Sequence, residues 1–412
     1  MINFKKITLK NGLRFIYNID KSTPLVAFNI MYNVGSKNEK TDKTGLAHFF
    51  EHLMFSGTPD IDDFDYYTQI CGGDNNAFTN NDNTDFYLTL PAENLEMAFC
   101  LEADRMNNLS ITKQKFSTEK KVVIEEFKET TLNVPYGEMW HVLSEMSYTK
   151  HPYMWPTIGK NIQDIEKMNL EDVMEFYSDF YVPENAIIAV SGNFDEETIL
   201  GYLEKWFGNI QKKSSNNVDL DIEPKQDSFK QKTIVSDVPS NAIYLAFHVD
   251  GRNGKNYYIQ DLISDILGRG RSARLYQNLV KKNQLFTEIH AYMTGTNDPG
   301  LLIIEGLVND GIYIAKAENA LFSELEKLKT ELISDEELTK LKNKMINQLA
   351  FEELNILYKA MNLCQFESIG NIDMINSQME YYQDVNQEQI KKESNELFKL
   401  TNCSKLIYKK EK

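Results

Sequence analysis

The chain has 412 residues, which is enough for two domains with substantial hydrophobic cores. Its formal net charge of −17 at pH 7 excludes the basic surface that non-specific nucleic-acid binding requires. No segment approaches the roughly 18 apolar residues of a membrane span, and no apolar signal-type segment follows Met1. The sequence therefore predicts a cytoplasmic protein without a membrane span.

The first half of the chain alternates between strand and helix patterns. Polar and apolar residues alternate near residues 4–17 and 24–34, which predicts strands, and a helical pattern follows around residues 45–54. Further strands are expected near residues 76–90, and several helices then lead to an apolar closing strand at 186–192. This mixture of elements predicts an α+β fold.

The helix around residues 45–54 carries the run His48-Phe49-Phe50-Glu51-His52. At about 100° per residue, His48, Glu51 and His52 share one side of the helix, so two imidazoles one turn apart can bind one metal ion. The carboxylate between them can hold a water molecule and take its proton, because zinc lowers the pKa of such a water towards about 7. The competing interpretation is a surface helix that carries two histidines by chance.

A hydrolytic zinc site uses three protein ligands and one open position, so a third ligand must come from elsewhere in the chain. The acidic segment 116–127 is the candidate, because its apolar residues recur on one helical stripe. Glu119 and Glu126 lie seven residues apart, about two turns, so both point the same way. One of them can bind the ion while the other orients a ligand, unless the segment is only a solvated helix face.

The segment 45–58, Gly-Leu-Ala-His-Phe-Phe-Glu-His-Leu-Met-Phe-Ser-Gly-Thr, resembles the active-site helix of the M16 metallopeptidases. This is the inverzincin family of pitrilysin, insulysin and the mitochondrial processing peptidase. In the family, a Glu-x-x-x-x-x-x-Glu segment further along the chain ends in the third zinc ligand, and Glu119 and Glu126 have that spacing. The family pattern disfavours the neighbouring Glu125 and Glu129 as ligands.

The resemblance implies a role for each residue of the motif. His48, His52 and Glu126 are the implied ligands of Zn²⁺. Glu51 is the implied general base, and Glu119 is the implied supporting acid behind the ligands.

Further segments of the first half resemble the same family. Residues 76–87 match its Asn-Ala-x-Thr strand, an exposed edge along which relatives bind an extended substrate, so Asn76 and Ala77 are expected to line the peptide. Main-chain hydrogen bonds along a sheet edge bind a peptide with little regard to its sequence. The other matching segments are 101–106, 151–159 and 181–185.

The chain repeats itself once. The strand that leads to Gly35 matches the strand that leads to Gly251, at an offset of 216 residues. The segment that ends at Asn185 matches one that ends at Asn402, at an offset of 217 residues. Two similar offsets predict two tandem homologous α/β-sandwich domains, as in M16 relatives, in which pairs of two-domain units close like a clamshell around a chamber.

The repeat sets the expected domain boundaries. We expect a zinc-binding catalytic domain at 1–210, a polar and flexible linker at 211–232, and a homologous domain at 233–412. The counterparts of the two histidines and the glutamate of the motif are Ser264, Leu267 and Gly268. The second copy is therefore expected to hold no zinc.

The second half departs from the family at two positions. After the Gly-rich stretch 268–276, active members carry an Arg and, seven residues later, a Tyr, which bind the substrate carbonyl and stabilise the oxyanion. Val280 and Thr287 stand there instead, and loss of such stabilisation costs about 10²- to 10³-fold in rate. One explanation is a dimer in which a related M16-like subunit supplies the pair, or a homodimer. The other is substitution by Arg274, Tyr276 or Tyr292.

The sequence therefore predicts a zinc-dependent endopeptidase that hydrolyses peptides or unfolded segments inside a chamber completed by a partner subunit. The alternative is a non-catalytic M16-like scaffold or assembly subunit that keeps the fold. Retention of every zinc-site residue favours the enzyme.

Overall fold

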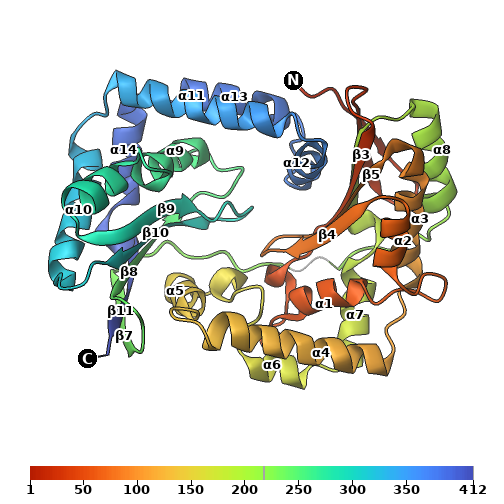
Figure 1. Cartoon of the computed structure of the whole chain (residues 1–412), viewed down its shortest axis with the longest axis horizontal. Helices are drawn as coiled ribbons and strands as arrows, with labels where there is room; N and C mark the ends of the chain where they lie inside the picture. Colours follow the sequence, from red (N-terminus) through yellow and green to blue (C-terminus); the bar gives the residue numbers. More distant parts are fainter. Residues whose placement is uncertain (217–218, 412) are drawn as a thin grey trace. The chain divides into compact units, whose positions relative to one another are not determined.

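The computed structural model describes residues 1–216 and 219–411. The chain divides into two compact units, each with its own sheet and hydrophobic core; Figure 1 shows their elements. Unit 1 comprises Met1–Lys128, Trp155–Leu220 and Ala350–Asn376. Unit 2 comprises Glu129–Met154, Asp221–Leu349 and Ser377–Lys412.

Unit 1 is built on a mixed sheet that has six strands among the described residues. In spatial order these are β1 (Lys5–Thr8), β2 (Arg14–Ile19), β6 (Ala186–Gly192), β3 (Leu25–Tyr32), β5 (Thr84–Pro91) and β4 (Asp74–Thr79). Only β2 and β6 run parallel, and the other neighbours are antiparallel. The strands expected near 4–17, 24–34, 76–90 and 186–192 are thus confirmed, and β4 forms one edge of the sheet.

Most helices of unit 1 pack on one face of this sheet, because every second side chain of its strands is apolar. On β5, Phe86, Leu88 and Leu90 are buried on this face, and on β3 the ring of Phe28 packs edge to face against Phe99, with centroids 5.0 Å apart. The helices that contribute to this layer are α1 (Leu46–Met54), α2 (Phe64–Ile70), α3 (Leu95–Asn108), α4 (Lys113–Phe127), α6 (Ile162–Lys167), α7 (Leu170–Phe180) and α8 (Glu196–Phe207).

The other face of the sheet is covered by α12 (Ile356–Ser368), a helix from the second half of the sequence (Figure 1). It contacts β2, β3 and β6, and the buried thiol of Cys364 lies 3.5 Å from the carbonyl oxygen of Ile187. Lys359 on the same helix forms an ion pair with Asp20 at 2.6 Å. The core of unit 1 therefore depends on a helix that lies 177 residues from β6 and 339 residues from Asp20 along the chain, counted between the residues in contact.

Unit 2 repeats the strand order of unit 1, with one strand fewer among the described residues. Its strands, in spatial order, are β7 (Lys230–Ser236), β11 (Cys403–Lys410), β8 (Ala242–Val249), β10 (Gly300–Val308) and β9 (Phe286–Met293). The first pair is parallel and the others are antiparallel, as are the equivalent strands of unit 1. This shared topology confirms the duplicated α+β architecture that the repeat predicts.

Helices also cover both faces of the second sheet. Those packed with its main core are α9 (Tyr257–Gly268), α10 (Ile314–Thr330), α11 (Asp335–Glu352) and α14 (Gln387–Leu397), and α13 (Met374–Asp384) precedes the last of them. On the opposite face α5 (Met139–Ser147) packs against β8 and β11. No helix in the described part of the chain combines the length and apolarity that crossing a membrane requires.

The compact units differ from the contiguous halves that the repeat suggests. Residues 129–154, inside the expected domain 1–210, belong to unit 2, and residues 350–376, inside the expected domain 233–412, belong to unit 1. The physical reason is that each sheet leaves one apolar face bare within its own half. A helix of the other half, α5 or α12, covers that face.

The expected linker at 211–232 is only partly irregular. Its described residues up to 229 have no helix or strand, residues 217–218 lie outside the described residues, and β7 already begins at Lys230. The carboxylate of Glu223 accepts hydrogen bonds from the backbone N–H groups of Thr149 and His151, each at 2.9 Å. The later part of the segment is therefore fixed to unit 2, in contrast to the flexible hinge that its composition predicts.

A buried polar pair lies in unit 1 on the sheet face that α12 covers. Asn29 on β3 donates a hydrogen bond to Asp85 on β5 at 2.8 Å, and both side chains are fully buried. Asn29 Oδ1 and Asp85 Oδ2 have no hydrogen-bond partner within the described part of the chain. Burial raises the pKa of Asp85 to about 7, because the charged form loses its hydration. Asp85 interacts electrostatically with Cys364 of α12 and with Tyr87 of β5. Cys364 in turn interacts with Arg14 of β2.

We predict that Asp85 makes the stability of the protein depend on pH. Because its folded-state pKa of about 7 exceeds the ordinary value of 3.8, its contribution to stability is full below about pH 4 and is lost as the pH rises through 7. We expect the free energy of unfolding of wild type, measured with urea, to fall by about 2 to 3 kcal/mol relative to that of Asp85→Asn between pH 5 and pH 8. Asp60→Asn, at an exposed site, is the control and should follow wild type. Parallel pH profiles for wild type and Asp85→Asn would contradict the prediction.

Candidate metal centre

Helix α1 presents the histidine motif on its outer side. Phe49, Phe50 and Leu53 are fully buried on the core side of the helix, whereas His48 and His52 keep 15% and 26% of their side-chain surface exposed. This division follows from the 3.6-residue period of the sequence. It gives the two imidazoles and the Glu51 carboxylate a common face, as the sequence predicts.

The start of α1 is held by a buried carboxylate. Glu39 accepts hydrogen bonds from the backbone N–H groups of Gly45 and Ala47, at 2.9 and 2.8 Å, and from Nε1 of Trp155 at 3.0 Å. Gly45 has a φ of +88°, and a Cβ there would lie 2.7 Å from the carbonyl oxygen of Ile158. Glu39 therefore caps free N–H groups at the start of α1. Position 45, directly before the helix, has no space for a residue larger than glycine.

Helix α4 brings the acidic segment against α1. The Thr112 side chain caps its start by accepting a hydrogen bond from the N–H of Lys115, at 3.2 Å. Phe116 meets Phe49 of α1 edge to face, with ring centroids 5.5 Å apart, and Val123 is fully buried. This packing places the face of α4 that carries Glu119 and Glu126 next to the histidines.

The three expected ligands converge. Nε2 of His48 lies 3.6 Å from one carboxylate oxygen of Glu126, and Nε2 of His52 lies 3.4 Å from the other. One ligand atom from each of the three residues lies within 4.8 Å of the others, and theirs is the one such group of His, Cys, Asp or Glu found in the described residues. Two imidazoles and a carboxylate are the ligand types of hydrolytic zinc sites, so the donor set fits Zn²⁺.

The groups of the candidate centre differ in their protonation. Burial lowers the pKa of His48 to about 4, so its ring is neutral at pH 7 and keeps a lone pair for a metal. The hydrogen bond with His52 lowers the pKa of Glu126, and the same contact raises the pKa of His52. The negative charge of the Glu126 carboxylate thus faces both rings.

Glu119 lies behind one of the histidines. Its carboxylate is 3.7 Å from Nδ1 of His52, the ring nitrogen that does not face Glu126. A carboxylate in this place can fix the tautomer and orientation of a metal-binding imidazole. The competitors lie elsewhere: Glu125 is exposed and forms an ion pair with Lys128 at 2.6 Å, and Glu129 is exposed beyond the end of α4.

Glu51 lies beside the converging ligands. It is partly buried, and burial raises the pKa of its carboxyl group. Its Oε2 atom accepts a hydrogen bond from the hydroxyl group of Thr79, the last residue of β4, at 2.5 Å. A carboxylate one residue before a candidate histidine ligand is placed to accept a proton from a water molecule.

The edge strand β4 runs next to α1. Asn76 is exposed on this strand, and Ala77 is partly buried against the core. The side-chain oxygen of Asn76 accepts the backbone N–H of Ala77 at 2.8 Å. The structure thus places both residues on an edge strand next to the metal centre, where the sequence expects the substrate strand, and their contact with a peptide stays a prediction.

The second half carries no equivalent metal centre among its described residues. The counterparts that the offset of 216 residues assigns to the motif, Ser264, Leu267 and Gly268, lie on α9, and none of them is a histidine or a glutamate. A Cβ at Gly268 would lie 1.9 Å from the backbone nitrogen of Ala291 on β9. Because α9 packs this closely on its edge strand, a histidine could not stand at position 268.

The residues considered for oxyanion stabilisation are engaged in other contacts of unit 2. Val280 packs against the hydrophobic core, and the Thr287 hydroxyl donates to the carbonyl oxygen of Leu307 at 3.2 Å. Arg274 forms a bidentate ion pair with Glu337, at 2.6 and 2.9 Å, and the hydroxyl of Tyr292 lies 3.3 Å from a carboxylate oxygen of Glu305. Tyr276 is the partly exposed first residue of the π-helical segment Tyr276–Lys282.

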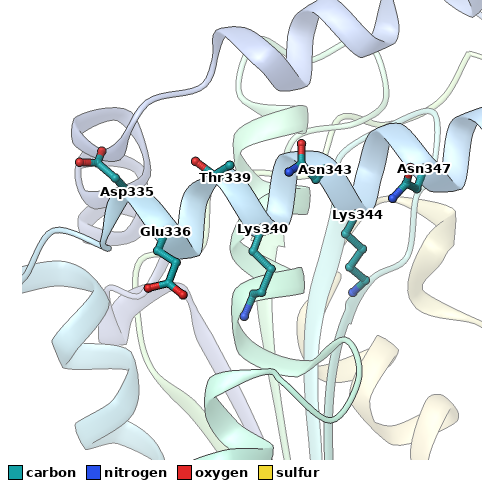
Figure 2. A pocket seen from close by; sticks show the side chains of 7 residues that line it. All are labelled: Asp335, Glu336, Thr339, Lys340, Asn343, Lys344 and Asn347. Atoms are coloured by element: carbon teal, nitrogen blue, oxygen red, sulfur yellow. The ribbon is translucent and has the colours of Figure 1, made fainter.

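A hollow along α11 has a different character (Figure 2). Its lining side chains are spread along one helix rather than turned toward a common point. They are Asp335, Glu336, Thr339, Lys340, Asn343, Lys344 and Asn347. This surface resembles a solvated helix face and offers no convergent set of catalytic groups.

Two residues that support the centre are not identified by the sequence reasoning. Glu39 lies outside the motif, and Thr79 belongs to the Asn-Ala-x-Thr segment but receives no role there. Glu39 precedes the helix by a few residues and Thr79 lies 28 residues beyond Glu51, so helical spacing contains no signal for either contact. The threonine that ends the strand motif was the one available clue.

Comparison with known proteins agrees with the fold and the motif. Residues 14–156 match the family model described as insulinase (peptidase family M16), and residues 167–345 match the peptidase M16 inactive domain. The zinc protease PqqE of Helicobacter pylori is 30% identical over 352 residues, which are 84% of this chain and 78% of that protein.

Two solved structures share the fold. A protease from Helicobacter pylori superposes with a TM-score of 0.94 at 27% identity, over 99% of this chain and all of the other. The periplasmic protease PqqL from Escherichia coli gives a TM-score of 0.81 at 18% identity, over 99% of this chain but only 48% of the longer one. Together with the sequence matches, they show that the chain belongs to the M16 peptidase family.

Proposed function

We propose that this protein is a zinc-dependent endopeptidase that hydrolyses peptides or unfolded polypeptide segments. The observation that carries the proposal is the convergence of His48, His52 and Glu126, with Glu51 beside them. The relatives named zinc proteases support the same reaction class. Peptides are the proposed substrate because an edge strand, β4, lies next to the candidate centre.

Each residue has a defined task in this proposal. A zinc ion held by the two histidines and Glu126 would act as a Lewis acid and lower the pKa of a water molecule. Glu51 would take the proton from the attacking water and pass it to the leaving amine. Glu119 would hold the His52 ring through Nδ1, at the 3.7 Å separation seen in the structure.

Substrate binding would use the edge of β4. A strand at the edge of a sheet has unpaired N–H and C=O groups, and an extended peptide can add to it as a further strand. Asn76 and Ala77 lie in the middle of β4, so peptide addition there would carry the chain past the metal centre. Because these contacts are made with the peptide backbone, they favour unfolded segments of varied sequence.

Glu51→Gln should abolish peptidase activity while the protein keeps its zinc. Gln has nearly the same shape but cannot accept the proton, and loss of a general base costs about 10²- to 10⁴-fold in rate. The measurement is turnover of fluorescein-labelled casein, with zinc content determined by mass spectrometry. Glu125→Gln, at an exposed carboxylate of α4, is the matched control and should behave as wild type.

The same measurement separates the enzyme from the alternative, a non-catalytic M16-like scaffold. The match of residues 167–345 to a domain described as inactive keeps that alternative open. A scaffold would have no zinc-dependent turnover for Glu51→Gln to remove. Equal activity of Glu51→Gln and wild type would refute the proposed mechanism.

Zinc affinity should depend on the two acids of α4 to different degrees. Glu126→Gln removes a direct ligand and should weaken zinc binding by at least about 100-fold, whereas Glu119→Gln should weaken it by about 10- to 100-fold. Competition with a chromogenic chelator measures both constants. Wild-type affinity in Glu126→Gln would exclude this residue as a ligand.

We further propose that the active form contains a partner chain. This chain superposes on only about half of the Escherichia coli PqqL chain, so the longer relative has room for a second part of similar length. Val280 and Thr287 occupy the positions where the resemblance expects an Arg and a Tyr, and neither can stabilise an oxyanion. A related M16-like subunit could supply the missing pair across a chamber, whereas a homodimer could supply only the residues already present.

The partner proposal predicts weak activity of the purified chain. Turnover of labelled casein by the chain alone should be about 10²- to 10³-fold lower than turnover by the complex copurified from the native source. Light scattering during gel filtration would report the mass of each preparation. Full zinc-dependent turnover by the isolated chain would refute the need for a partner.

A further inference from the structure

We infer that Thr79 is a positioning residue for Glu51: its hydroxyl group fixes one carboxylate oxygen of the proposed base and leaves the other oxygen for the water. This inference rests on the proposed function and goes beyond it, because it adds a residue from the substrate strand to the catalytic arrangement. Three observations carry the inference. They are the contact itself, the anchoring of the hairpin that holds Thr79, and the place of Thr79 at the end of β4, the strand that also carries Asn76 and Ala77.

The contact is short and specific. The Thr79 hydroxyl donates to Glu51 Oε2 at 2.5 Å, in the range of O–H to carboxylate hydrogen bonds. Among the described residues, Thr79 is the one donor of a hydrogen bond to the Glu51 side chain. A glutamate side chain has three rotatable bonds, so a single strong contact at Oε2 decides where Oε1 lies. The hydroxyl thereby selects one orientation of the base.

The hairpin that holds Thr79 is anchored independently of Glu51. Thr79 pairs with Thr84 across a tight turn, in which the N–H of Asn80 donates to the carbonyl oxygen of Asn83 at 3.0 Å. The turn is fastened to another segment by the N–H of Ser36, which donates to the carbonyl oxygen of Asn80 at 3.2 Å. The hairpin contacts thus fix the position of the Thr79 hydroxyl without any contribution from Glu51.

Gly35 faces this turn, and the space around it shows how closely the hairpin is packed. At Gly35, a Cβ would lie 2.4 Å from the carbonyl oxygen of Asn80. No larger residue fits at that position without moving the turn. The hairpin therefore has little freedom to carry Thr79 away from Glu51.

The nearby threonine makes a different use of its hydroxyl group. Thr84 donates to the backbone carbonyl oxygen of Val34 at 2.9 Å, and its hydroxyl oxygen lies 3.4 Å from that of Thr79, well beyond the 2.5 Å contact of Thr79 with Glu51. Thr79 instead gives its single hydroxyl hydrogen to Glu51. Since β4 also carries Asn76 and Ala77, one strand would align the peptide and orient the base at the same time.

The test compares two substitutions at Thr79. Thr79→Val keeps the shape of the side chain and removes the hydroxyl, whereas Thr79→Ser keeps the hydroxyl and removes the methyl group. We expect Thr79→Val to lower kcat for labelled casein by about 10- to 100-fold with KM and zinc content unchanged, and Thr79→Ser to stay within about threefold of wild type. Thr68→Val is the matched control, because its hydroxyl donates to the carbonyl oxygen of Phe64 on α2, away from Glu51.

Crystal structures of the zinc-loaded variants provide a readout that does not need activity. We expect Glu51 to leave its wild-type rotamer or to occupy several rotamers in Thr79→Val, and to keep a single rotamer in Thr79→Ser. A purely structural role would reverse the pattern, since loss of the methyl group would then harm Thr79→Ser more than Thr79→Val.

The outcomes separate this inference from the proposed function. Wild-type kcat and an unchanged Glu51 rotamer in Thr79→Val would overturn the positioning role while leaving the peptidase in place. A wild-type protein without turnover, in which Glu51 still loses its orientation in Thr79→Val, would overturn the peptidase proposal alone. Equal loss of kcat in Thr79→Ser and Thr79→Val would also overturn the role of the hydroxyl.

Discussion

The packing of α1 against α4 is the contact on which the candidate site depends. Neither helix has a complete ligand set, since α1 supplies two imidazoles and α4 supplies the carboxylate of Glu126. The contact between Phe49 and Phe116 and the burial of Val123 fix the rotation of α4. With the apolar side of each helix committed to the core, the polar sides are left to face one another. The convergence of the candidate ligands therefore follows from the same packing that stabilises the unit.

The duplicated scaffold shows how one fold keeps a site in one copy and loses it in the other. Both sheets have the same strand order, and both carry a helix beside their edge strand. In unit 2 that helix lies so close to β9 that only glycine fits at Gly268. In unit 1, α1 instead presents His52 with the carboxylates of Glu119 and Glu126 at 3.7 and 3.4 Å from its two ring nitrogens. Among the described residues, only the first copy therefore brings together side chains that could hold a metal ion.

The groups that hold the centre in place come from segments outside the motif. Glu39 holds the first turn of α1 through backbone N–H groups, Thr79 reaches Glu51 from β4, and Glu119 lies behind His52. Each contact restricts a side chain or helix end that would otherwise have several orientations. Such restriction is what a catalytic arrangement requires, because misplacement of a reacting group by about 1 Å can cost 10²-fold in rate.

The sequence by itself determined the elements whose patterns are local: the helix of His48, Glu51 and His52, the strands of the first half, and the repeat that relates the two halves. Periodicity is a property of neighbouring residues, so it can be recognised without knowledge of the fold. Spacing alone left open whether Glu119 or Glu126 faces the histidines, and resemblance to a family was needed to choose between them. Only the tertiary structure decided that α5 and α12 exchange between the halves, that the later linker is fixed by Glu223, and that Thr79 holds Glu51. These features join residues far apart in the chain, where the requirement to cover apolar faces and pair buried polar groups outweighs any local pattern.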